Sequence, residues 1–263
     1  MDIARYHKDH HLKIEIQERI ALLTLDRPDK HNAVNYALHK GLEAAFEELS
    51  HHPDVGAIVI TGAGRSFCAG GDLVGFNPPD PSPLDIIRNR GLNWSQARCE
   101  APLIAAVNGT AAGLGASIAL TCDVVYMAES ARIGDTHVKV GLVAGDGGQV
   151  MWPLLVGLNR AKEYLMAGEL IDAAEADRID LVNRVLPDDE LLDYAMNYAR
   201  KVANGAQVAI RWTKMAINKM LYQQLNANLE FGLATEQICS STEDTQEAMA
   251  AFREKRTPHF KGR

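Results

Sequence analysis

The sequence has few cysteines and no closely spaced pair of them. Its four cysteines, Cys68, Cys99, Cys122 and Cys239, stand far apart, and no C-x-x-C spacing occurs. This pattern excludes a disulfide framework and a cysteine-ligated metal, and we predict no metal site of another kind. The N-terminal segment MDIARYHKDHHLKIEI also lacks the apolar stretch of a secretory signal. We therefore expect reduced thiols and a cytoplasmic location.

The chain also lacks a long uninterrupted apolar run and an excess of positive charge. Its most apolar stretch, residues 103–128, contains Asn108, Asp123 and three glycines, which are costly in lipid. The 27 Lys and Arg are outnumbered by 34 Asp and Glu, which gives a net charge of −7. Such a body repels nucleic acid. We expect neither a membrane span nor a nucleic-acid partner.

Apolar runs of strand length alternate with helical patterns in the first half of the chain. Strands are predicted at 12–16, 20–25, 55–61, 103–107 and 124–127, and helices at 36–49 and 113–120. This alternation is typical of βαβ units in a largely parallel sheet. Helical patterns then dominate, at 149–156, 160–167, 190–203, 207–222, 225–239 and 243–255. The sequence therefore predicts an α/β core followed by a helical layer, packed on that core or on a neighbouring subunit.

Two glycine-rich turns follow predicted strands. They are the segments SFCAGGDL at 66–73 and NGTAAGLG at 108–115. Glycines in such turns let backbone N–H groups face a ligand. The second segment is not a dinucleotide fingerprint, because Ile118 stands where the third glycine would be. Two turns of this kind predict an oxyanion hole for a thioester or ester carbonyl.

These turns, together with DRPDKHNA at 26–33, the pair Cys122-Asp123 and the basic segment FREKR at 252–256, resemble the crotonase superfamily, also called enoyl-CoA hydratase/isomerase. The resemblance covers essentially the whole chain. It implies a spiral of ββα units at 1–200 and a C-terminal helical trimerisation region at 201–263. It also implies an acyl-CoA substrate, no cofactor beyond the CoA of that substrate, and a homotrimer or a dimer of trimers. The implied oxyanion-hole amides belong to Gly71 and Leu114, and the implied CoA contacts are Lys30, Ala33, Ala69, Asp72, Leu73, Phe260 and Lys261.

The sequence departs from the family at two glutamates that handle the water and the proton. The matching positions hold Ser117 and His137. A serine hydroxyl cannot act as an unassisted general base at neutral pH, whereas an imidazole titrates near neutrality. Asp146 would fix the tautomer of His137 and stabilise its imidazolium. The spacing from His137 to Asp146 is similar to that in 6-oxocamphor hydrolase, a superfamily member that cleaves a cyclic β-diketone, and the third acidic residue of that enzyme matches Glu236.

The loss of both glutamates beside complete CoA-binding blocks predicts hydrolytic C–C cleavage of a cyclic or branched β-ketoacyl-CoA. In this hypothesis His137 is the base, Asp146 orients it, and Glu236 is a third catalytic residue. Two alternatives stay open, namely an enoyl-CoA hydratase/isomerase in the broad sense and a catalytically silent CoA-binding scaffold. An aspartyl nucleophile at Asp146 and a Ser117 nucleophile are weaker hypotheses. The first lacks an aromatic cluster beyond Trp152, and the second needs a geometry that the sequence does not supply.

Overall fold

The strands of the larger sheet form the centre of the molecule. The computed structural model describes residues 3–73 and 90–263, and within them six strands lie in the order β1-β2-β3-β5-β7-β10. β1 and β2 pair antiparallel, and every later pair is parallel. The strands are β1 (Leu12–Gln17), β2 (Ile20–Leu25), β3 (Ala57–Gly62), β5 (Leu103–Val107), β7 (Val124–Ala128) and β10 (Arg184–Leu186). The predicted, largely parallel sheet is confirmed.

A second sheet of short strands accompanies the first. Within the described residues it has the order β4-β6-β8-β9. Its strands are β4 (Ser66–Cys68), β6 (Thr110–Ala112), β8 (Arg132–Gly134) and β9 (Ile171–Asp172). β4, β6 and β8 each follow a strand of the larger sheet, and the chain then enters a helical segment. Those segments are α4 (Gly91–Arg98), α5 (Leu114–Leu120), and η2 (His137–Val140) with α6 (Gly148–Val156). This repeat confirms the predicted spiral of ββα units.

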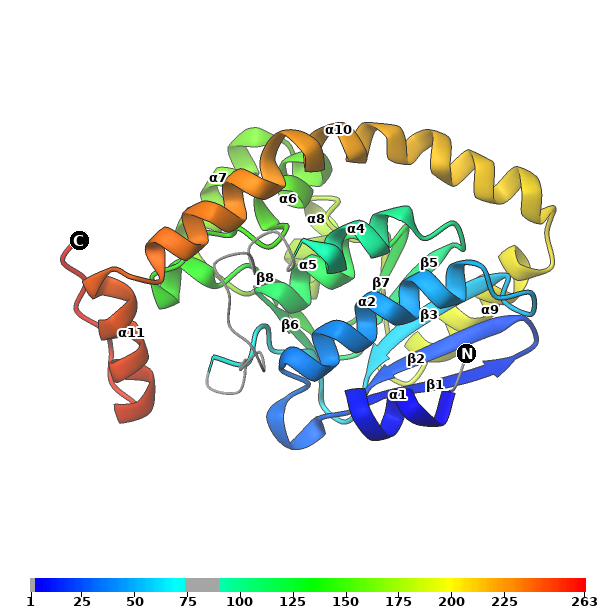
Figure 1. Cartoon of the computed structure of the whole chain (residues 1–263), viewed down its shortest axis with the longest axis horizontal. Helices are drawn as coiled ribbons and strands as arrows, with labels where there is room; N and C mark the ends of the chain where they lie inside the picture. Colours follow the sequence, from blue (N-terminus) through cyan, green and yellow to red (C-terminus); the bar gives the residue numbers. More distant parts are fainter. Residues whose placement is uncertain (1–2, 74–89) are drawn as a thin grey trace.

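Helices cover the larger sheet, which explains why its strands are continuous apolar runs. Every residue of β3 and β5 is buried. α2 (Tyr36–Ser50) packs against α4 in front of the sheet, as Figure 1 shows. α9 (Leu191–Ala203) packs across β2, β3, β5 and β7. The glycine-rich turns therefore follow the carboxyl ends of parallel strands that are fixed in the buried sheet.

The C-terminal part of the chain is helical. It contains α7 (Leu158–Ala167), α8 (Ala173–Arg178), α9, α10 (Gln207–Cys239) and α11 (Glu243–Glu254). We predicted separate helices at 207–222 and 225–239, which is wrong, because α10 is one helix of 33 residues. Gln223 and Gln224 are good helix formers, and no proline or glycine interrupts that junction. In Figure 1 α10 runs along the top of the molecule, and it contacts α4, α6 and α9.

The structure also differs from the sequence-based expectation at the N-terminus. The N-terminal helix α1 (Ile3–His10) was not predicted, and its Tyr6 is buried against the core. The boundary expected between residues 200 and 201 falls inside α9, so the division into a core and a trimerisation region stays a prediction. Among the described helices, none combines the length and the apolar character that a bilayer crossing requires.

Candidate active site

The two glycine-rich turns lie side by side and line one cavity of about 270 Å³. Gly71 forms a parallel bridge with Val34, in which the flanking groups Gly70 O and Asp72 N bond to Val34. The N–H of Gly71 therefore points away from Val34. Leu114 is the first residue of α5, where an N–H has no intrahelical acceptor. Both residues are on the cavity wall, so the structure brings together the two turns that the sequence singled out.

Two glycines allow this close approach. Gly70 has a φ of 101°, and a side chain there would meet Ala112 O at 2.9 Å. Gly113 has a φ of 51°, and a side chain there would meet His137 Cε1 at 3.3 Å. Both φ angles lie in the left-handed region that favours glycine. Residues with a Cβ at these positions would be strained, and they would push the two turns and His137 apart.

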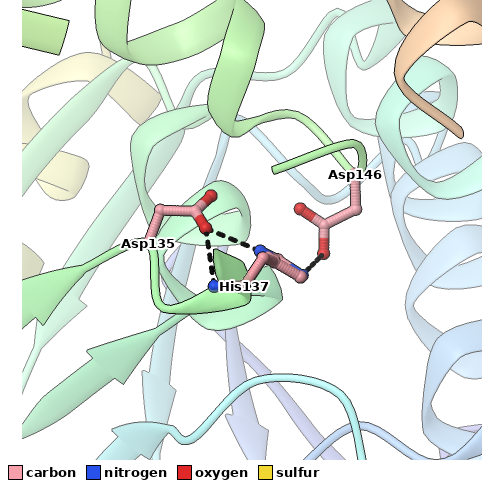
Figure 2. A group of neighbouring side chains, drawn as sticks. All are labelled: Asp135, His137 and Asp146. Carbon is pink, nitrogen blue, oxygen red and sulfur yellow. Dashed lines mark hydrogen bonds and ion pairs between the residues drawn. The ribbon is translucent and has the colours of Figure 1, made fainter. Parts of the chain in front are cut away.

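His137 lies between two aspartates, as Figure 2 shows. Its Nδ1 is 2.6 Å from Asp135 Oδ1, and its Nε2 is 3.1 Å from Asp146 Oδ2. Asp135 Oδ1 also accepts from the backbone N–H of His137 at 3.2 Å. The predicted pairing of His137 with Asp146 is therefore present. A carboxylate that orients a catalytic histidine usually bonds its Nδ1. Here Asp135 contacts Nδ1, and Asp146 contacts Nε2.

Asp135 was missed from the sequence, although it stands two residues before His137. Its side chain is almost fully buried and does not line the cavity, whereas those of His137 and Asp146 do. A methyl group at Gly148, the first residue of α6, would overlap Asp135 Oδ2. The Asp-x-His spacing was the available signal. A carboxylate two residues upstream can bond both the ring and the backbone N–H of the histidine.

Ser117 and Asn93 both donate hydrogen bonds to Asp146. The Ser117 hydroxyl donates to Asp146 Oδ1 at 3.0 Å, and Asn93 Nδ2 donates to the backbone oxygen of Asp146 at 2.8 Å. Ser117 therefore contacts the candidate machinery through Asp146 and does not line the cavity. This arrangement disfavours the hypothesis of a Ser117 nucleophile activated by His137, because the hydroxyl donates to a carboxylate and not to the imidazole.

His137 and Asp146 shift each other's pKa. Burial alone would lower the pKa of His137, but the charge of Asp146 and the hydrogen bonds to both aspartates hold that pKa well above 6.5. Burial would raise the pKa of Asp146, but the charge and hydrogen bond of His137, with the Ser117 hydrogen bond, lower it. These shifts favour an imidazolium at His137 paired with a carboxylate at Asp146. The raised pKa favours the protonated form of His137 in the resting site, and its expected role as the base stays a prediction.

The pKa shifts of two more titratable groups on the cavity wall favour their neutral forms at pH 7. Burial, together with the charge of Asp146, raises the pKa of Glu236 on α10 to about 8. Burial, together with the charge of Lys40, lowers the pKa of His39 on α2 to about 4. The structure therefore brings the predicted Glu236 to the cavity of His137 and Asp146. His39 was not singled out from the sequence.

Asp135, His137 and Asp146 are also a group that could hold a metal ion, because one ligand atom of each lies within 4.8 Å of the others. The two ring nitrogens of His137 face different carboxylates, and one ion can bind only one ring nitrogen. A proton on each nitrogen satisfies both carboxylates at once. The contacts present are those of an imidazolium, and an ion bound to all three residues would displace one of them.

Five of the predicted CoA contacts come together beside the cavity. Segments 27–34 and 69–72 are joined by backbone hydrogen bonds, among them Ala69 N to His31 O at 3.0 Å and Asp72 N to Val34 O at 2.9 Å. The Asp72 carboxylate is paired with Arg27 Nη2 at 3.0 Å. Lys30, Ala33, Ala69, Asp72 and Leu73 all lie on these two segments or directly after them.

The other two predicted contacts, Phe260 and Lys261, lie elsewhere, on the tail that follows α11 (Figure 1). Lys261 N and Gly262 N donate to the Asp244 carboxylate at 2.6 and 2.8 Å, and Arg263 Nε is 3.1 Å from Glu243 Oε2. The basic tail thus folds against the acidic first turn of its own α11. A contact of Phe260 and Lys261 with CoA stays a prediction.

Comparison with known proteins matches residues 15–263 to the family model of enoyl-CoA hydratase/isomerase. The chain is 37% identical to the 2,3-dehydroadipyl-CoA hydratase of Escherichia coli over 257 residues, which cover 96% of this chain and 99% of that protein. It is 36% identical to a probable enoyl-CoA hydratase of Rhizobium meliloti over 256 residues, or 96% and 98% of the two chains. The crystal structure of an enoyl-CoA hydratase/isomerase from Pseudoalteromonas atlantica superposes with a TM-score of 0.88 at 32% identity, covering 95% of this chain and 100% of that one.

Proposed function

The chain belongs to the enoyl-CoA hydratase/isomerase family, and from that membership we propose that it adds water to the acyl group of a CoA thioester. One observation carries the proposal. A single cavity is lined by Gly71 and Leu114, whose N–H groups are predicted to form the oxyanion hole, and by His137 and Asp146. In hydration, water adds to C3 of a 2-enoyl thioester, and the thioester oxygen becomes an enolate oxyanion. Donors aimed at that oxygen stabilise the charge as it develops.

His137 and Asp146 supply the proton transfers in this proposal. Asp146 accepts a proton from the attacking water, whose oxygen bonds to C3. The imidazolium of His137 then donates its Nε2 proton to C2 of the enolate, which completes the 3-hydroxyacyl product. This leaves a protonated Asp146 beside a neutral His137. Because Asp146 Oδ2 and His137 Nε2 are 3.1 Å apart, one proton passing between them restores the resting pair.

Asp135 and Ser117 position this pair without touching the substrate. Asp135 bonds Nδ1 of His137, which fixes the ring and favours its protonated form. Ser117 bonds Asp146 Oδ1, which leaves Oδ2 for the water and for His137. Charge-assisted hydrogen bonds of this kind are stronger than neutral ones. In this arrangement one carboxylate and one imidazolium carry out the two proton transfers that two glutamates carry out elsewhere in the family.

A second candidate function is hydrolytic C–C cleavage of a cyclic or branched β-ketoacyl-CoA, the reaction type of 6-oxocamphor hydrolase. The same pair serves it, because Asp146 accepts the proton of water attacking the β-carbonyl, and His137 protonates the enolate expelled when the adduct collapses. The neutral carboxyl of Glu236 on the cavity wall favours this candidate, since it can donate to a ketone oxygen. The hydratase names of the relatives favour hydration.

The assembly is part of the same proposal. Several large apolar side chains of α10 are exposed in the single chain, among them Trp212 and Phe231, each 71% exposed. Exposed apolar side chains of this kind are typical of a surface that another subunit covers. We propose that α10 contributes to the contacts of a homotrimer or a dimer of trimers.

Turnover of a panel of CoA thioesters, followed by mass spectrometry, tests the function. The panel holds straight-chain 2-enoyl-CoAs, 2,3-dehydroadipyl-CoA, and cyclic and branched 3-oxoacyl-CoAs. Hydration appears as a gain of one water with the carbon skeleton intact, and C–C cleavage of a cyclic substrate appears as a ring-opened acid. The proposal expects one of these products to be lost in His137→Ala. No turnover of any member by the folded protein would favour the scaffold alternative.

A further inference from the structure

Glu236 occupies an unusual place on the wall of the active-site cavity. It reaches that wall from α10, whereas Gly71 and Leu114 belong to the two glycine-rich turns. Its Oε2 is buried beside Gly145, where a methyl group would come within 2.7 Å of it, and it has no hydrogen-bond partner among the described residues. The protein therefore leaves a buried polar atom unsatisfied on a residue that lines the cavity. An atom of this kind costs free energy unless a ligand or water bonds its group.

The charges around Glu236 determine what its carboxyl group can bind. Asp146, His137 and Asp135 are the charged groups that act on it, and two carboxylates outweigh one imidazolium. Burial, together with this excess of negative charge, raises the pKa of the carboxyl to about 8 and so favours its protonated form at pH 7. A neutral carboxyl group donates one O–H hydrogen bond. The same negative charge repels an anionic ligand.

Apart from the groups assigned to the reaction, the cavity wall offers few other hydrogen-bond donors. Besides Gly71, His137 and Asp146, the cavity wall consists of four leucines, of Asp72, which is paired with Arg27, and of the two polar side chains of His39 and Asn93. The leucines are Leu73, Leu114, Leu142 and Leu233. Asn93 already uses its amide N–H to hold the backbone of Asp146. Beyond the groups assigned to the thioester oxygen and to proton transfer, an acyl group in the cavity would thus meet leucine side chains and the carboxyl group of Glu236.

We propose that Glu236 selects acyl groups that carry a neutral oxygen, a ketone or a hydroxyl, beyond the thioester carbonyl, over plain hydrocarbon chains and over chains that end in a carboxylate. The inference rests on the proposed function only in that the acyl group of a CoA thioester occupies this cavity. It holds for hydration and for C–C cleavage alike. In both, Glu236 contacts the acyl group, while His137 and Asp146 move the protons.

Binding of matched ligands tests the proposal without turnover. The probes are hexanoyl-CoA, adipyl-CoA and a set of hexanoyl-CoAs that carry one ketone at C4 or C5, or one hydroxyl at C4, C5 or C6, carbons that neither proposed reaction converts, titrated by calorimetry at pH 7. The best oxygenated probe is expected to bind about tenfold more tightly than hexanoyl-CoA, which corresponds to one hydrogen bond to a buried donor. Adipyl-CoA is expected to bind more weakly than hexanoyl-CoA.

Three variants identify the source of the preference. Glu236→Leu should reduce the ratio to about one while hexanoyl-CoA binds at least as well as in the wild type, and Glu236→Gln should keep part of the ratio through its amide N–H. Glu230→Leu, also on α10 but away from this cavity, is the control and should keep the full ratio. In the wild type the preference should fade between pH 7 and pH 9 as Glu236 ionises, and in Glu236→Gln it should not.

The possible failures are distinguishable. If hexanoyl-CoA and every other thioester fail to bind the folded protein, the proposed function is wrong and this inference falls with it. If the thioesters bind but the wild type does not prefer any oxygenated probe, or Glu236→Leu keeps the preference, only the role of Glu236 is wrong.

Discussion

Asp135→Asn should change the pH dependence of the reaction more than it changes the fold. The substitution keeps the size of a buried side chain and removes the charge 2.6 Å from His137 Nδ1. A hydrogen bond to a charged group contributes about 1.5–3 kcal/mol, and one pKa unit corresponds to about 1.4 kcal/mol. The pKa of His137 should therefore fall by about 1–2 units. Because His137 must be protonated to donate to C2, the alkaline limb of kcat/KM should move to lower pH by the same amount.

The stability of the protein should show the same shift. The pKa of His137 is raised in the folded protein, so its contribution to the free energy of unfolding is complete below about 6.5, the value of an unperturbed histidine. It is lost as the pH rises through the raised folded pKa. In Asp135→Asn this loss should begin at lower pH. The control is Asp172→Asn, which removes the same charge at the N-cap of α8, outside the cavity.

Steady-state kinetics across pH, with urea unfolding at each pH, measures both effects. NMR of the imidazole nitrogens gives the pKa of His137 directly. If the alkaline limb and the imidazole titration of a folded Asp135→Asn coincide with those of Asp172→Asn, Asp135 does not set the protonation of His137, and the proton cycle loses its support.

Three further predictions concern the surroundings of the pair. Ser117→Ala should lower kcat about tenfold, because Asp146 loses one charge-assisted hydrogen bond, and a loss as large as that of Asp146→Asn would show that Ser117 reacts itself. Gly71→Pro removes one N–H from the oxyanion hole and should cost about 10²–10³ in kcat, so near wild-type turnover in the folded variant would exclude that site. Truncation after Thr257 should raise KM for CoA esters more than it lowers kcat. An unchanged KM at low salt would show that the tail serves only α11.

The sequence predicted the buried parts of the fold well, because both faces of the larger sheet are covered and its strands are continuous apolar runs. β5 was predicted at its observed bounds. The strands of the second sheet were not predicted, since β4, β6 and β8 have three residues each and carry no periodic pattern of their own. The helices predicted at 207–222 and 225–239 are one helix, α10. The apolar pattern weakens between them, but no residue there ends the helix.

The candidate site was predicted where a backbone turn or a motif marked it. Gly71, Leu114, His137, Asp146 and Glu236 do line one cavity. Asp135 was missed because sequence spacing does not say that a side chain turns back onto a ring two residues later. The raised pKa of His137 was also beyond the sequence, because it depends on two aspartates contacting opposite nitrogens of one imidazole.

The central claim is that His137 and Asp146 act as one proton-transferring pair on a CoA thioester. A double-mutant cycle with His137→Ala, Asp146→Asn and the double variant, using the best thioester of the panel, tests it most directly. Each single substitution should lower kcat/KM by about 10²–10⁴, the usual contribution of general acid–base catalysis. The double variant should be no slower than the slower single one, because residues that act as a unit are non-additive. Losses that multiply in the double variant, or efficient turnover that survives both substitutions, would contradict the account.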